Sequence, residues 1–246
     1  MPPLDLTFLQ RLPWLQSRRH CQLCDEATDH LTHSICTACE AELPWLGAHC
    51  RICAVPLPAH DMICGACQKK PPYFSRVEAP WRYAFPVDNL ITRFKHQKQW
   101  PHGRLLAELL AEHLIHAYDE GLPRPQALLP VPLARRRQRQ RGFNQAQMLA
   151  DWLGACLKLP VHNDWLQRRI DTPSQQGLDA ATRKRNLRQA FSIGPHAQVA
   201  GTHLALVDDV LTTGATAGML AHLLRRAGAL RVDVYCLART PRPGDG

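Results

Sequence analysis

Eight of the ten cysteines in this chain lie between residues 21 and 67, in four pairs that all have the spacing C-x-x-C. The pairs are Cys21/Cys24, Cys36/Cys39, Cys50/Cys53 and Cys64/Cys67. The short turn inside each pair directs two sulfur atoms to one point, and a second pair completes a tetrahedron around a metal ion. Two structural zinc sites are therefore expected in a double zinc ribbon over residues 15–70, where bound metal replaces most of a hydrophobic core.

Other uses of these cysteines fit the pattern less well. A thioredoxin-like redox motif needs one C-x-x-C at the start of a helix, whereas four pairs supply ligands for two metal ions. Pairing in chain order gives two successive ribbons, and a crossed pairing stays open. His20 and His49 each adjoin a cysteine, but eight thiolates already fill two sites. The remaining cysteines, Cys156 and Cys236, are expected to be small core residues.

Composition and charge narrow the class of protein further. The chain has 246 residues, of which 45% are hydrophobic, so it can bury a substantial core. No apolar run approaches the roughly 20 residues of a membrane helix, and we expect a cytoplasmic protein. The net charge is +9, and nine basic residues lie in two segments without an acid: Arg135, Arg136, Arg137, Arg139 and Arg141, then Arg183, Lys184, Arg185 and Arg188. Charge focused in this way points to an anionic partner.

Strand and helix patterns alternate after a Lys-Lys-Pro-Pro boundary at residues 69–72. Buried strands are predicted at 127–131, 203–207 and 232–237, with a short strand at 81–85, and helices at 144–157 and 216–227, with an amphipathic helix around Leu106–Leu114. Such alternation predicts a parallel sheet flanked by helices on both faces, forming a domain over residues 74–246.

The most informative stretch is LALVDDVLTTGAT, residues 204–216. A buried strand leads into two carboxylates and then into a Thr/Gly loop that opens a helix. The free N–H groups and the dipole of a helix N-terminus attract phosphate, and Gly214 lets the backbone approach closely. Asp208 and Asp209 can accept hydrogen bonds from sugar hydroxyls or help to hold hydrated Mg²⁺. Together these residues are suited to binding a ribose 5-phosphate.

This stretch resembles the 5-phosphoribosyl 1-diphosphate (PRPP) signature of the type I phosphoribosyltransferases. Two further motifs, PVPLARRRQRQRGFNQ at 130–145 and the segment 172–191, resemble the ComF/GntX family, which joins such a domain to a double zinc ribbon. The resemblance implies a catalytic role for Asp208 and Asp209. It implies PRPP and Mg²⁺ binding by Asp208, Asp209, Val210, Leu211, Thr212, Thr213, Gly214, Ala215 and Thr216. It also implies contacts to pyrophosphate, or a hood over the site, from Pro132, Leu133, Arg135, Arg136, Arg137, Arg139, Arg141, Gly142, Asn144, Gln145, Thr172, Gln175, Arg183 and Asn186.

The arginine run at 135–141 has two functional interpretations. Guanidinium groups match phosphate oxygens in a bidentate geometry, so the run is suited to clamping pyrophosphate. Five arginines exceed what one pyrophosphate needs, which favours single-stranded DNA along the same face, with Phe143 or Trp152 available for stacking. A merely solvated basic loop is the third interpretation.

Three functions remain open from the sequence. The family resemblance implies a protein of natural competence, DNA uptake or the use of imported DNA, which binds PRPP and single-stranded DNA and has DNA-uptake proteins as further candidate partners. The alternative is a nucleotide-salvage phosphoribosyltransferase, although the segment after Leu237 is expected to be too short for a base pocket. A purely structural adaptor would leave the Asp-Asp and Thr-Gly motif without a use.

Overall fold

The computed structural model describes residues 20–29, 32–168 and 190–241, and it divides the chain into two compact units. The smaller unit is Met1–Leu43 and contains the first two cysteine pairs. The larger unit is Pro44–Gly246 and contains the other two pairs together with the α/β fold. The predicted boundary between ribbons and α/β domain, at residues 70–74, stays a prediction. The second pair of cysteine motifs shares a compact unit with the sheet.

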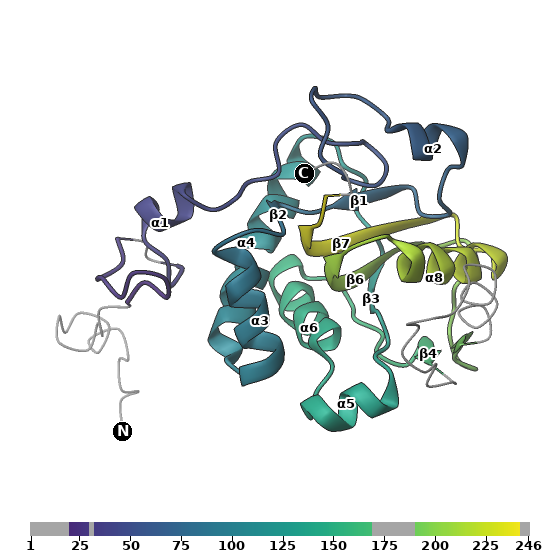
Figure 1. Cartoon of the computed structure of the whole chain (residues 1–246). Coiled ribbons are helices and arrows are strands. Elements are labelled where there is room, and N and C mark those ends of the chain that lie inside the picture. The colour runs from purple at the N-terminus through teal and green to yellow at the C-terminus, as the bar shows by residue number, and fades with distance from the viewer. Residues whose placement is uncertain (1–19, 30–31, 169–189, 242–246) are drawn as a thin grey trace, which may run out of the picture. The chain divides into compact units, whose positions relative to one another are not determined.

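A five-stranded parallel sheet forms the centre of the larger unit (Figure 1). Its strands are β1 (Arg76–Glu78), β2 (Trp81–Arg82), β3 (Ala127–Pro130), β6 (His203–Leu211) and β7 (Arg231–Arg239). The spatial order is β1-β7-β6-β3, and β2 also pairs with β7. The pairings of β7 with β1, β2 and β6, and of β6 with β3, are all parallel, which confirms the predicted α/β class.

Helices flank this sheet, and the two predicted at 144–157 and 216–227 are found within one residue of their expected bounds. The flanking helices are α2 (Gly65–Lys69), α3 (Val87–Gln97), α4 (Trp100–Asp119), α5 (Arg135–Arg141), α6 (Gln145–Leu157) and α8 (Ala215–Arg226). The side chain of Asn144 accepts a hydrogen bond from the N–H of Ala146 and so caps α6. The smaller unit has one described helix, α1 (Thr37–Ala41).

The two faces of the sheet have different coverings. Successive side chains of a strand point to opposite faces. Leu204 and Leu206 of β6 join a core cluster with Leu220 and Leu224 of α8 and with the second set of cysteines. On the other face, α4 and α6 pack against each other and against β7 and β6, respectively. The sheet is therefore buried on both sides, as parallel sheets usually are.

Several local expectations need correction. Strand β6 does not end at Val207 but continues through both aspartates to Leu211, because Val210 and Leu211 still pair with β7. The short strand predicted at 81–85 covers only Trp81–Arg82. Residues 135–141 are a helix and not a loop. Cys236 is buried as expected, whereas Cys156 is exposed, so the core prediction for Cys156 is wrong.

An antiparallel hairpin, β4 (Leu166–Arg168) with β5 (Phe191–Ile193), was not predicted. Among the described helices, none is both long and apolar enough to cross a membrane.

Candidate functional site

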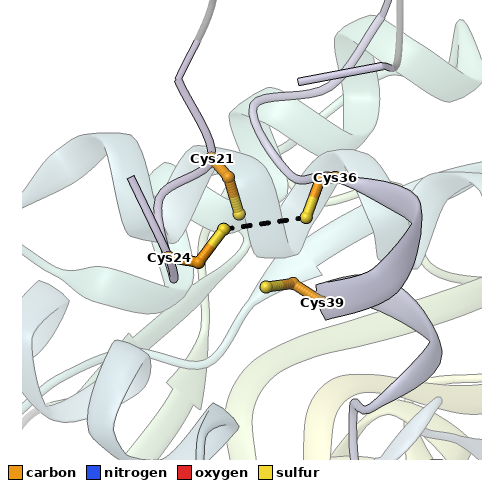
Figure 2. Close-up of side chains that lie close together, drawn as sticks. All are labelled: Cys21, Cys24, Cys36 and Cys39. Carbon is orange, nitrogen blue, oxygen red and sulfur yellow. Dashed lines mark hydrogen bonds between the residues drawn. The ribbon is translucent and has the colours of Figure 1, made fainter. Parts of the chain in front are cut away.

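The first cysteine cluster has the geometry of a tetrahedral metal site (Figure 2). The sulfur atoms of Cys21, Cys24, Cys36 and Cys39 all lie within 4.8 Å of one another. Sγ of Cys24 lies 3.8 Å from Sγ of Cys36. A tetrahedron with zinc–sulfur bonds of about 2.3 Å has sulfur–sulfur edges of about 3.8 Å. The donor set and its spacing therefore fit Zn²⁺.

The second cluster repeats this arrangement in the larger unit. Cys50, Cys53, Cys64 and Cys67 also lie within 4.8 Å of one another, and all four are buried. Sγ of Cys53 lies 3.7 Å from Sγ of Cys64, again the edge of a zinc tetrathiolate. The pairing in chain order is confirmed by both clusters, and the crossed pairing is not formed.

The two clusters share one backbone design. In each, the residue four positions after the first cysteine has a positive φ and donates its N–H to that cysteine's carbonyl: Asp25 to Cys21 and Ala54 to Cys50, both at 2.9 Å. His20 and His49 occupy equivalent positions. Their Nδ1 atoms lie 2.8 Å from the Asp25 carbonyl and 2.7 Å from the Gly47 carbonyl, and neither histidine belongs to a sulfur cluster.

In each cluster the local hydrogen bonds favour the thiolate form of one cysteine, and thiolate is the form that binds metal. Burial opposes the charge on Cys21, but backbone N–H groups of the cluster lower its pKa to about 6. Burial likewise opposes the charge on Cys64, whose pKa falls to about 6 through hydrogen bonds from the backbone of Cys67 and from the neighbouring thiols. In the second cluster the Cys64 N–H also donates to Sγ of Cys50 at 3.3 Å. Each cluster thus holds one thiolate near neutral pH before metal adds its own charge.

The two aspartates at the end of β6 have different environments. Asp208 is half-buried, and its Oδ1 accepts the N–H of Asp209 at 2.9 Å. Burial and the neighbouring Asp209 carboxylate raise the pKa of Asp208 to about 8. Asp209 is only 5% exposed, and its Oδ2 lies 2.7 Å from Nζ of Lys95 at the end of α3. Asp209 therefore has a fixed cationic partner, whereas burial and the adjacent carboxylate favour the protonated form of Asp208.

The loop after β6 has the predicted shape. Gly214 has φ +71°, a left-handed conformation that glycine adopts without strain, and it caps the N-terminus of α8. The hydroxyl of Thr213 accepts the N–H of Ala215 at 3.3 Å. The Thr212 and Thr213 side chains are exposed, and Thr216 is half-buried. Hydroxyl donors and a helix N-terminus therefore lie within a few residues of the aspartates, as a phosphate ester requires.

Basic side chains surround a cavity of about 250 Å³ next to this edge. Its lining combines the end of α3 with helix α5: Lys95, His96, Lys98, Arg137, Gln140 and Arg141. Arg141 is half-buried, and its Nη1 donates to Oε1 of Gln145 at 2.9 Å. Burial lowers the pKa of Arg141, and the Asp209 carboxylate opposes this, so the cavity and the aspartates belong to one electrostatic site. Four lysine and arginine side chains line this small cavity, and although Lys95 is paired with Asp209, the remaining positive charge favours an anion as its occupant.

The other predicted site residues fall into three groups. Pro132 and Leu133 are half-buried between β3 and α5, and the Asn144 amide donates to the Val131 carbonyl at 3.2 Å. Arg136, Arg137 and Arg139 are exposed on α5, which also contains Arg135, and Gly142 ends this helix. The predicted hood residues Thr172, Gln175, Arg183 and Asn186 lie outside the described residues, so these assignments stay predictions.

Three basic residues of this edge were missed from the sequence. Lys95, His96 and Lys98 form a third basic group without an acid, and a search for focused charge could have found it. Trp100 was also missed. Its ring is half-exposed and lies 6.5 Å from the ring of Phe143, which in turn lies 5.6 Å from Phe94. Trp152 packs against Phe94 at 5.9 Å.

The chain is similar in sequence to several known proteins. The family model for the double zinc ribbon domain matches residues 12–68. The DNA utilization protein YhgH of Escherichia coli K12 is 36% identical over 207 residues, which cover 84% of this chain and 90% of that protein. Competence protein F of Haemophilus influenzae is 36% identical over 84% of this chain and 91% of its own length. Competence protein ComFC of Bacillus subtilis is 25% identical, with 84% of each chain covered.

Solved phosphoribosyltransferases are similar to part of the chain. The glutamine PRPP amidotransferase of Bacillus subtilis matches 55% of this chain and 25% of its own, with 20% identity and a TM-score of 0.38. The adenine phosphoribosyltransferase of Leishmania tarentolae matches 54% of this chain and 70% of its own, with 15% identity and a TM-score of 0.36.

Two four-cysteine clusters with zinc-site geometry, a parallel sheet and an Asp-Asp edge followed by a Thr-Gly loop together define an α/β protein with two candidate zinc sites. The matches to two relatives at 36% identity span about nine-tenths of the length of each relative. The chain belongs to the ComF/GntX family.

Proposed function

We propose that this protein binds PRPP with Mg²⁺ at the end of β6 and single-stranded DNA along α5, and that it acts in natural competence or in the use of imported DNA. The observation that carries the proposal is the union of three groups at one sheet edge. These are the carboxylates of Asp208 and Asp209, the loop at Thr212–Thr216, and the basic cavity lined by Lys95 and Arg141.

Each group has a chemical task in this proposal. The loop and the N-terminus of α8 bind the 5-phosphate, and Asp208 accepts hydrogen bonds from the ribose hydroxyls. The basic cavity takes the pyrophosphate end, because guanidinium and ammonium groups neutralise its charge. Mg²⁺ would supply further charge neutralisation next to the carboxylates. Because Asp209 is already paired with Lys95, Asp208, once deprotonated, is the carboxylate that would help to hold that ion.

We assign DNA to α5 because this helix has more arginines than the two that line the cavity. Arg137 and Arg141 line the cavity, whereas Arg136 and Arg139 are exposed beside it. Trp100 offers a half-exposed ring near Phe143 for base stacking. The names of the relatives, a DNA utilization protein and two competence proteins, support a process that handles DNA.

Calorimetry tests this proposal directly. PRPP with Mg²⁺ should bind, and an oligothymidine added afterwards should bind as well, with an affinity that PRPP changes if the two sites are coupled. Binding of neither ligand would overturn the proposal. The variant Asp208→Asn should weaken PRPP while leaving oligothymidine binding unchanged, which separates the two ligands.

A salvage phosphoribosyltransferase remains the second candidate, and one cavity supports it. A cavity of about 550 Å³ lies beside Thr212, Thr213 and Gly214 and has room for an acceptor. In such a reaction the acceptor nitrogen would form a bond to the ribose C1, and the bond from C1 to pyrophosphate would break. Release of pyrophosphate when nucleobases are added with PRPP and Mg²⁺ would favour this candidate.

A further inference from the structure

A single buried arginine connects the second cysteine cluster with the phosphate loop. Arg239 is the last residue of β7 and is 3% exposed. Its Nε donates to the carbonyl of Cys53 at 2.8 Å. Its Nη1 donates to the carbonyls of Leu211 at 3.1 Å and Thr212 at 2.5 Å. One rigid guanidinium thus bonds the backbone of a metal-ligand residue and the backbone that begins the loop.

The charge of this arginine needs an explanation. Burying a cation without an anion is costly. Among the described residues, no carboxylate forms an ion pair with Arg239, and its hydrogen bonds go to carbonyl oxygens and to the Thr240 hydroxyl. A zinc ion with four thiolates carries a formal charge of about −2. Metal loading of the cluster at Cys50, Cys53, Cys64 and Cys67 would place that charge beside the guanidinium and compensate it.

Cluster and loop also form the walls of one cavity. The cavity of about 550 Å³ is lined by Cys53 and Cys67 of the cluster, by Ala66 and Lys70 of helix α2 and its C-cap, and by Thr212, Thr213 and Gly214 of the loop. Arg239 lines it as well. The ring of Phe74 lies next to the loop, since a Cβ atom built on Gly214 would be 3.8 Å from that ring. The second cluster is therefore part of the surroundings of the loop.

The first cluster belongs to the other compact unit. Its four cysteines lie in the smaller compact unit, and the Arg239 bonds and the cavity lining both involve the larger unit. The two clusters have the same ligands and turns but different neighbours.

We infer that Arg239 is a positioning residue that couples the second metal site to the phosphate loop, so that metal at Cys50, Cys53, Cys64 and Cys67 sets the loop's affinity for a phosphate ester. Metal at the first site has no such effect. The inference rests on the proposed binding of PRPP by this loop, and it makes the two metal sites unequal in function.

Reciprocity supplies the test. If metal strengthens PRPP binding, PRPP must strengthen metal binding by the same factor. The full-length zinc protein is mixed with a coloured zinc chelator, and release of the two ions is followed with and without PRPP and Mg²⁺. We expect PRPP to weaken chelator extraction of one ion by about tenfold and to leave the other unchanged. In Cys36→Ser, which has lost the first ion, the protected ion should remain.

Two arginine variants separate positioning from general stability. Arg239→Lys keeps the charge but lacks the fork that reaches Cys53 and Leu211 together, so protection by PRPP should disappear and PRPP should bind about tenfold more weakly. Arg231→Lys is the matched control, because it lies at the other end of β7, where its Nε pairs with Asp233 at 2.9 Å. This control should keep full protection.

Different results would refute the coupling and the proposed function. If PRPP binds but both ions leave at unchanged rates, or if Arg239→Lys keeps protection, the coupling is refuted. If PRPP does not bind at all, the proposed function is wrong, and the unliganded variants still decide the role of Arg239. In that case Arg239→Lys must lose its second zinc faster than Arg231→Lys does, and equal rates would refute the role.

Discussion

Asp208 and Asp209 are neighbours in the chain, but a strand directs them to opposite faces of the sheet. Asp209 lies on the face of the sheet that α3 covers, where it pairs with Lys95. Asp208 lies on the opposite face, the same one as Leu204 and Leu206, which pack with α8. The alternation gives one carboxylate a structural partner and leaves the other with a raised pKa. Two identical side chains thereby acquire different properties at one site.

The raised pKa of Asp208 should make the folded protein less stable as the pH rises. This pKa is 3.8 in the unfolded chain and about 8 in the fold, so between these values the folded protein holds the extra proton and stability falls with rising pH. Asp208→Asn removes this loss. Because the side chain is partly exposed, we expect a gain of about 1–2 kcal/mol at pH 8.5 and a smaller gain at pH 6. Thermal unfolding at both values checks it, and a gain that shrinks at higher pH would contradict the raised pKa.

Lys95 should be needed for the fold because Asp209 is buried. Lys95→Met leaves the Asp209 carboxylate without its cation, and we expect a loss of about 2–4 kcal/mol, since one partner of the pair keeps some solvent contact. The double variant Lys95→Met with Asp209→Asn should lose less than the sum of the single variants. Denaturant unfolding of all three variants measures this coupling, and strict additivity would mean that the pair contributes nothing.

At the scale of the elements, buried and periodic segments were predictable and charged ones were not. The pattern of α6 and the apolar start of β6 gave their positions within a residue or two. The end of β6 was missed because aspartates interrupt the apolar run, while pairing with β7 holds the backbone extended. Helix α5 has no apolar face in its seven residues RRRQRQR, so periodicity could not reveal it.

Only those parts of the candidate site that are continuous in the sequence could be predicted from it. The Asp-Asp and Thr-Gly motif and the cysteine sets are continuous signals, and the fold confirms the pairing of the cysteines. Lys95 and Arg239 lie 114 and 30 residues away from Asp209, and only the packing of α3 and the pairing of β7 with β6 bring them to the same edge. Long-range partners of this kind have no signature in a single sequence.

Helix α5 should bind DNA through its exposed arginines. Replacing Arg136, Arg137 and Arg139 by alanine keeps the helix, because alanine favours it. Affinity for oligothymidine should fall, and the slope of log affinity against log salt should decrease by about two units, at about 0.7 per phosphate. The control is Arg82→Ala with Arg104→Ala and Arg226→Ala, three exposed positions elsewhere with the same change in charge. Equal losses in both variants would mean general electrostatics, and an unchanged slope would place DNA elsewhere.

At the scale of the whole molecule, the two clusters should contribute differently to stability. Metal analysis of the purified protein should give about two zinc ions per chain. Cys36→Ser should lose one ion and unfold only the smaller unit, because the larger unit has its own core. Thermal unfolding of the larger unit should then be unchanged. A metal content near zero after anaerobic purification would refute the zinc assignment for both clusters.

The two candidate boundaries predict opposite results for shortened chains. If an α/β domain begins at residue 74, a fragment of residues 74–246 should fold alone. If the second cluster belongs to the same cooperative unit, this fragment exposes the core that Cys50, Cys53, Cys64 and Cys67 cover, and Arg239 loses the Cys53 carbonyl. We expect fragment 44–246 with zinc to unfold cooperatively and fragment 74–246 to be unfolded or aggregated. Circular dichroism and calorimetric unfolding of both fragments decide between the boundaries. A cooperative transition in fragment 74–246, at the temperature of the longer fragment, would make the second cluster an independent ribbon and remove the basis for its coupling to the phosphate loop.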